Sequence, residues 1–77
     1  MKEILEAIIK NLVDDPNQVS INETTNDKSI ICYEVKVSKN DMGKVIGKQG
    51  RMAKAIRSVI KAIAIHEHKK VNVEFLD

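Results

Sequence analysis

Apolar residues recur along this chain with two periods, one typical of helices and one typical of strands. Residues 2 to 13 place apolar side chains at helical spacing and end at the breaker Asp14-Asp15-Pro16-Asn17. A second helical pattern covers residues 51 to 64, with one apolar stripe formed by Met52, Ala53, Ile56, Val59, Ile60, Ile63 and Ala64. Each pattern predicts an amphipathic helix.

Three further segments alternate apolar and polar residues with a period of two: residues 19 to 21, 31 to 37 and 71 to 75. The turn residues Thr25-Asn26-Asp27-Lys28 join the first two segments into a predicted antiparallel hairpin. The third segment follows two helices, so it can pair in parallel with the second through a crossover. Because Ile30 and Cys32 are also apolar, we expect the second strand to be central and buried most thoroughly at its start.

A short helix is expected between the hairpin and the long helix, over about residues 39 to 45. Ser38 and Asp41 have the spacing of a capping box at its start. The predicted order is helix, strand, strand, helix, helix, strand, which is an α+β fold with a mixed three-stranded sheet. The chain has 77 residues, and we expect residues 1–77 to form a single domain. This length is close to the lower limit at which a hydrophobic core is stable without disulfides or a metal.

Positive charge is concentrated in one third of the chain. Residues 39 to 61 carry seven Lys or Arg against Asp41 alone, whereas the segments on either side are net acidic and the whole chain is +2. Such a block is typical of a surface that binds a polyanion. The N-terminal residues contain acids and no long apolar run, so we expect no signal peptide, no membrane span and a cytoplasmic location.

Candidate catalytic and metal-binding groups are few. His66 and His68 lie two residues apart, which places them on different faces of a helix, and the Asp14-Asp15 pair fits a polar helix exit. No nucleophile, base and acid converge in a recognisable set. Cys32 is alone and is expected to be a buried, inert thiol. We therefore expect neither an enzyme, nor a metal, nor a cofactor.

The three glycines of the chain, Gly43, Gly47 and Gly50, lie within eight residues inside the basic block. Without a Cβ, the Gly47-Lys48-Gln49-Gly50 turn can approach a phosphodiester chain closely, and the helix that follows starts with unpaired N–H groups. A nucleotide-binding P-loop needs another spacing and a Ser or Thr after the Lys. A plain corner between two helices, closed by a glycine cap, explains the turn alone equally well.

The segment Val45-Ile46-Gly47-Lys48-Gln49-Gly50-Arg51 and the helix that follows resemble the Ile-Gly-x-x-Gly core of KH domains. The element order resembles the type II arrangement, and the whole chain resembles the small single-domain KhpA family of bacterial proteins. This resemblance implies a type II KH domain, α-β-β-α-α-β, whose sheet packs on three helices. It also implies binding of single-stranded RNA, with the turn on the phosphates and Ile46 lining a groove under the bases. The candidate RNA-binding residues are Lys44, Ile46, Gly47, Lys48, Gln49, Gly50, Arg51 and Lys54.

The resemblance further implies a role in RNA chaperoning, links to control of cell elongation and division, and pairing either with itself or with a larger KhpB-like KH-domain protein. Tyr33 and Phe75 are the only aromatic residues and both fall in strand patterns, so base stacking on aromatic rings should be minor and RNA binding weak and broadly specific. The alternative is an interaction module in which the apolar stripe around Met52 to Ile63 and the exposed parts of the turn mainly build a dimer, and RNA binding is incidental.

Overall fold

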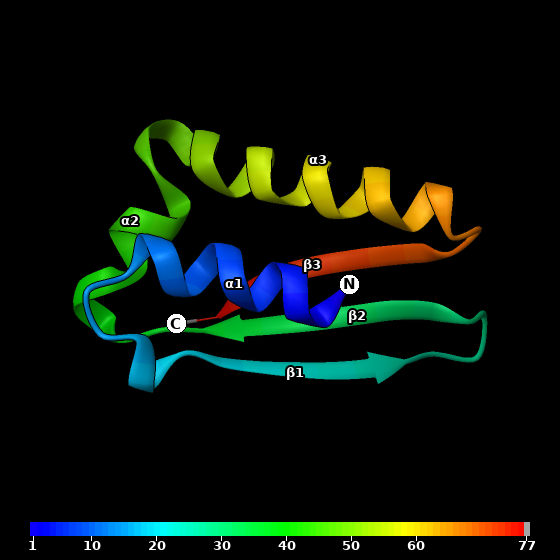
Figure 1. Cartoon of the computed structure of the whole chain (residues 1–77), viewed down its shortest axis with the longest axis horizontal. Coiled ribbons are helices and arrows are strands. Elements are labelled where there is room, and N and C mark those ends of the chain that lie inside the picture. The colour runs from blue at the N-terminus through cyan, green and yellow to red at the C-terminus, as the bar shows by residue number, and fades with distance from the viewer. Residues whose placement is uncertain (77) are drawn as a thin grey trace.

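The apolar periodicities fold into helices and strands in the predicted order (Figure 1). The computed structural model describes residues 1–76, so Asp77, at the end of the predicted domain 1–77, lies outside the described residues. The helices of this part are α1 (Lys2–Leu12), α2 (Met42–Ile46) and α3 (Arg51–His66), and the strands are β1 (Ser20–Thr25), β2 (Ile30–Lys36) and β3 (Lys70–Leu76). Short 3-10 turns lie at Pro16–Gln18 (η1), Lys39–Asp41 (η2) and Lys48–Gly50 (η3). The predicted α+β class is confirmed.

The sheet has the order β1-β2-β3, with β1 antiparallel to β2 and β2 parallel to β3. The central place of β2 and the parallel pairing of β3 are thus confirmed. The hairpin turn is held by Asn26, whose Oδ1 accepts hydrogen bonds from the N–H groups of Lys28 and Ile30 at 2.9 and 3.0 Å. Asparagine is common in turns because its side chain can bond to the backbone two residues on.

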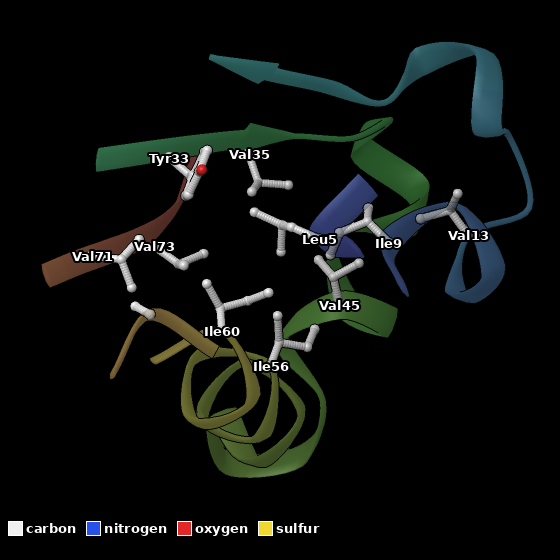
Figure 2. Close-up of a cluster of buried hydrophobic side chains, with 11 residues drawn as sticks. Leu5, Ile9, Val13, Tyr33, Val35, Val45, Ile56, Ile60, Val71 and Val73 are labelled. Carbon is white, nitrogen blue, oxygen red and sulfur yellow. The ribbon is translucent and has the colours of Figure 1, made fainter. Parts of the chain in front are cut away.

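The core lies between one face of the sheet and the helices (Figure 2). Strand residues Tyr33, Val35, Val71 and Val73 alternate along β2 and β3 and point toward the helices. They meet the buried side chains of the three helices, which include Leu5 and Ile9 from α1, Val45 from α2, and Ile56 and Ile60 from α3. Because α2 and α3 both contribute to this core, the turn between them is held over one end of the sheet.

The start of β2 is less buried than its middle, so that part of the prediction was wrong. Ile30 and Cys32 lie on the face of the sheet opposite the helices and are only half-buried, whereas Tyr33 and Val35 are fully buried. Cys32 was expected to be a buried thiol, and this was wrong because its side chain lies on the face of the sheet opposite the helices. Partial burial, together with the carboxylates of Glu74 and Glu34, raises the pKa of the Cys32 thiol and keeps it protonated.

The apolar stripe of α3 is narrower in the structure than the sequence pattern indicates. Its buried members are Ala53, Ile56, Ile60 and Ala64. Met52 and Val59, which the pattern also assigned to the stripe, are 38% and 47% exposed. The helix is rotated so that Ile56, Ile60 and Ala64 face the core, which leaves the larger Met52 and Val59 side chains on one flank of α3.

Candidate nucleic-acid interface

The Gly47–Gly50 turn has a backbone that requires glycine at its first position. Gly47 has φ 75° and ψ 177°, and a Cβ placed there would lie 2.7 Å from Cβ and 3.0 Å from the backbone N of Met52. Gly50 has φ 74° and ψ 14°, in the left-handed region, but a Cβ there would meet no atom within 4 Å. Gly47 is therefore needed for packing against α3, whereas the space beside Gly50 is open.

Backbone N–H groups at the tip of this turn are free. The N–H of Gly47 donates to the carbonyl of Gly43 at 2.9 Å and ends α2, and the N–H of Gly50 donates to the carbonyl of Gly47 at 3.3 Å. Within residues 1–76, the N–H groups of Lys48 and Gln49 have no backbone acceptor. Gly50 is the N-cap of the 16-residue α3 and provides no side-chain cap, so no side chain screens the positive end of the helix dipole.

Three cations surround the turn without an acidic partner. Lys48, Arg51 and Lys54 are exposed, and none of them forms an ion pair with any residue in the range 1–76. An anion placed at the turn would therefore meet full charges as well as N–H donors. The exposed Gln49 lies at the tip, and the half-buried Ile46 packs against the edge of the core just before it.

Lys44, which the sequence placed with these cations, lies in a different environment. Its ammonium group pairs with the carboxylate of Asp14, and it lies 3.8 Å from Oδ1 of Asp41. The hydrogen bond to Asp14, which outweighs partial burial, raises the pKa of Lys44. Lys44 thus has acidic partners in Asp14 and the buried Asp41, whereas Lys48, Arg51 and Lys54 have none among the described residues.

Asp41 holds the base of this region together, and the sequence did not indicate its partners. Only 2% exposed, it accepts hydrogen bonds from the backbone N–H groups of Asp14 and Asp15, both at 3.1 Å, and from Oγ of Ser38 at 2.8 Å. The Asp14 N–H above all holds the pKa of Asp41 below its usual value. The expected capping box is therefore not formed, because Asp41 binds the segment after α1 instead of the backbone N–H of Ser38. The polar helix exit at Asp14-Asp15 is fixed to the start of α2.

Arg57 and Phe75 form a contact that the sequence did not indicate. The Nε of Arg57 donates to the carbonyl of Val73 at 3.0 Å, and its guanidinium carbon lies 5.6 Å from the centroid of the Phe75 ring. One flank of α3 is thereby fastened over the edge strand β3. Nothing local in the sequence indicates this contact, because it depends on the parallel placement of β3.

Among the described residues, no group of three or more His, Cys, Asp or Glu side chains is arranged to hold a metal ion. Within the same part of the chain, no helix is both long enough and apolar enough to span a bilayer.

Comparison with known proteins gives consistent matches over nearly the full length. The family model for the KH domain of KhpA/KhpB matches residues 2–75. A protein of Clostridium perfringens named RNA-binding protein KhpA is 62% identical over 76 residues, which cover 99% of this chain and 100% of that protein. Proteins with the same name from Caldanaerobacter subterraneus and Chlamydia trachomatis are 53% and 46% identical, covering at least 99% of this chain and 97% or more of theirs. These relatives are named for RNA binding and not for a catalysed reaction, in agreement with the prediction of a non-enzymatic protein.

Two solved structures share the fold. Both are of the protein Era, one from Aquifex aeolicus bound to GDP.AlF4- and one in a complex with MgGDPNP and nucleotides 1506–1542 of 16S ribosomal RNA. Each superposes with a TM-score of 0.61 at 24% identity over 95% of this chain, which corresponds to 28% of the Era chain. At this identity the match shows the fold alone.

Proposed function

Since this chain belongs to the KhpA/KhpB KH-domain family, we propose that it binds single-stranded RNA and grips the RNA backbone with the Gly47–Gly50 turn. The observation that carries the proposal is the set of unpaired donors at the turn: the free N–H groups of Lys48 and Gln49. KH domains clamp about four backbone nucleotides with this kind of loop. Relatives that share more than half of this sequence are named for RNA binding.

Each candidate residue has a proposed part in the grip. The turn residues Gly47, Lys48, Gln49 and Gly50 hold phosphates, and Arg51 and Lys54 neutralise phosphates along the first turn of α3. Ile46 lines the groove beneath the bases. Lys44 is the least strongly placed of these cations, because the carboxylates of Asp14 and Asp41 offset part of its charge. Phosphate contacts fix the position of a strand but carry no sequence information.

Binding through the backbone supports a broad specificity. Tyr33 is buried in the core and therefore offers no stacking surface, and Phe75 lies beneath Arg57. We propose on this basis that residues 1–77 form one KH domain that acts in the cytoplasm as an RNA chaperone or adaptor. The link to control of cell elongation and division is proposed from the family resemblance.

The double variant Lys48→Asp with Gln49→Asp tests the proposed grip. Two new carboxylates would lie where phosphates bind, so RNA affinity should fall to the background of the assay. Both side chains are exposed, and such surface changes usually alter stability by less than about 0.5 kcal/mol. Binding is measured by fluorescence anisotropy with a labelled single-stranded RNA, and folding by thermal unfolding.

A matched control carries the same change in charge at the β1–β2 hairpin, at the other end of the molecule (Figure 1). In the control, Thr25→Asp is combined with Lys28→Asp, both exposed. It should retain most of the affinity, because long-range repulsion is screened within about 10 Å at 0.1 M salt. Equal losses in the two double variants, or normal affinity in the turn variant, would rule out a grip at the turn.

The second candidate function is an interaction module, and the exposed Met52 and Val59 on one flank of α3 favour it. In this proposal the flank pairs with a second copy of the chain or with a larger KhpB-like KH-domain protein. Val59→Gln should weaken self-association measured by sedimentation, whereas Ser58→Gln, an exposed change on the outward face of α3, should not. If the chain stays monomeric at high concentration, the flank does not pair with a second copy, and the larger KhpB-like protein is left as its proposed partner.

A further inference from the structure

A hollow rimmed by lysines lies between the last turns of α3 and the start of β3, at the end of α3 farthest from the glycine turn. It is lined by Lys61, Ala64, Ile65, Lys69, Lys70 and Val71. Its volume of about 190 Å³ is below the roughly 300 to 1,000 Å³ typical of sites that enclose a small molecule. The hollow therefore suits a single ring or one unit of a longer chain.

The charge around the hollow is positive. Three of its six lining residues are lysines and none is acidic, and Glu67 lies 3.9 Å from Lys69 in an exposed pair that contributes little attraction. The C-terminal carbonyls of α3 do not oppose an anion strongly, because those of residues 63 to 65 accept hydrogen bonds from the N–H groups of Glu67, His68 and Lys69. His68 has φ 57°, and this left-handed residue turns the chain so that two lysines lie beside the helix end.

The floor of the hollow is apolar. Ala64 and Val71 are buried beneath it, and Ile65 on its rim is 72% exposed, although it is a large aliphatic side chain. Lysine stems add further apolar surface while their ammonium groups stay in water. An apolar floor inside a cationic rim matches a nucleotide, which has a flat base and an anionic phosphate.

A row of cations connects the glycine turn with this hollow. Lys54, Arg57 and Lys61 recur every three or four residues and so lie on one flank of α3. Arg57 shows that this flank faces β3, because it bonds to the carbonyl of Val73. From Arg51 to Ile65 the helix rises about 21 Å, at about 1.5 Å per residue, so the row leads away from the turn along the side of α3 that faces β3.

We infer that the hollow binds one further nucleotide of the same RNA strand, with its base on Ala64, Ile65 and Val71 and with the two phosphates that flank it at the three lysines. The inference rests on the proposed RNA-binding function and extends it. A strand longer than the roughly four nucleotides held at a KH loop then follows α3 from the turn to the hollow.

The test compares oligouridylates of four and twelve nucleotides. For each RNA the affinity is measured over a series of salt concentrations, and backbone amide shifts of ¹⁵N-labelled protein locate the contacts. The salt slope is the main readout, because a longer strand offers more registers and gains affinity without new contacts. Each phosphate contact of a single strand contributes about 0.7 to the slope, so the two phosphates that flank the nucleotide in the hollow should make it steeper by about 1.4 for the longer RNA.

The triple variant Lys61→Ala, Lys69→Ala, Lys70→Ala should lose this extra slope and leave binding of the short RNA unchanged. The control triple variant Lys2→Ala, Lys28→Ala, Lys36→Ala removes the same charge from exposed positions elsewhere and should keep it. In the wild type, amides of residues 61 to 71 should shift with the longer RNA alone. Equal salt slopes for both RNAs, with amide shifts confined to the turn, would overturn the proposed nucleotide binding at the hollow. The proposed grip of the turn on RNA would not be affected. Absence of binding to either RNA would overturn both proposals.

Discussion

Replacing the two turn glycines by alanine, one at a time, should separate the folding role of Gly47 from the binding role of Gly50. Alanine at position 47 would occupy φ 75° and ψ 177°, a combination that is open almost only to glycine. Its Cβ would also lie 2.7 Å from Cβ of Met52. Because that atom is fixed to the backbone of α3, the overlap cannot be relieved by a rotamer change, and the start of the helix must move.

The size of the effect follows from these two contributions. Backbone strain of this kind costs about 1 to 3 kcal/mol, and forcing extra atoms into a packed site about another 1 to 3 kcal/mol. Gly47→Ala should therefore lower the free energy of unfolding by roughly 2 to 6 kcal/mol, a large part of what a small domain possesses. Gly50→Ala should lower the free energy of unfolding by only about 1 to 2 kcal/mol, the cost of placing alanine in the left-handed region. No steric cost is added, because no atom lies within 4 Å of the new Cβ.

Gly43→Ala is the matched control. Gly43 lies in α2, and a Cβ there meets nothing within 4 Å, so alanine should stabilise the helix by about 0.5 to 1 kcal/mol. Urea unfolding followed by circular dichroism gives the expected order of midpoints: Gly43→Ala highest, then wild type, then Gly50→Ala, with Gly47→Ala lowest. If Gly47→Ala unfolds within about 0.5 kcal/mol of wild type, the close approach to Met52 does not constrain the fold and the reasoning fails.

The same series tests binding. The open space beside Gly50 is where the backbone of an RNA strand would lie, so a methyl group there should weaken RNA binding at temperatures where the variant is fully folded. Gly43→Ala should bind as wild type does. Undiminished affinity in folded Gly50→Ala would show that the strand does not approach this glycine.

Three further predictions concern the scaffold. Ile60 is fully buried, so Ile60→Ala should cost about 2 to 5 kcal/mol in urea unfolding, and a wild-type midpoint would show that the α3 core contact is absent. Hydrogen bonds from the Asp14 N–H and other donors lower the pKa of Asp41 in the folded state, so its contribution to stability is present above about pH 4 and is lost as the pH falls through the lowered value. Urea midpoints should therefore decline on acidification, less steeply in Asp41→Asn, and equal declines in both proteins would contradict this. Burial, followed by Glu23, raises the pKa of Tyr33 to about 12, so its contribution is present below the ordinary value of about 10 and is lost as the pH rises toward 12. Tyr33→Phe should flatten that alkaline loss, and an unchanged alkaline profile would contradict it.

Element types and their order were predictable because they depend on local periodicity. A spacing of two along β2 and β3 and of three to four along α1 and α3 survives in the fold, since each element buries a single face. The glycine turn was also visible, because three glycines inside a basic block are unusual in a chain that has no others. Local patterns thus located both the scaffold and the turn.

Contacts between distant segments were not predictable in the same way. The ion pair that compensates Lys44 comes from Asp14, which lies 30 residues earlier, and local charge counting treats that lysine as free. The burial of Ile30 and Cys32 depended on whether helices cover one or both faces of the sheet. An apolar residue at the start of a strand is compatible with either arrangement, so the error at Cys32 arose from tertiary placement.

The rotation of α3 about its axis decides how the two candidate functions relate, and the sequence pattern alone did not give it. With 3.6 residues per turn, Val59 and Lys61 lie about 100° to either side of the buried Ile60. The contact of Arg57 with β3 identifies the Lys61 flank as the one over the edge strand, which leaves Met52 and Val59 on the opposite flank. An RNA strand along the cationic flank therefore does not cover the exposed apolar flank. The proposed RNA path and the proposed pairing surface therefore lie on different sides of one helix, so we expect that each can be removed by mutation without removing the other.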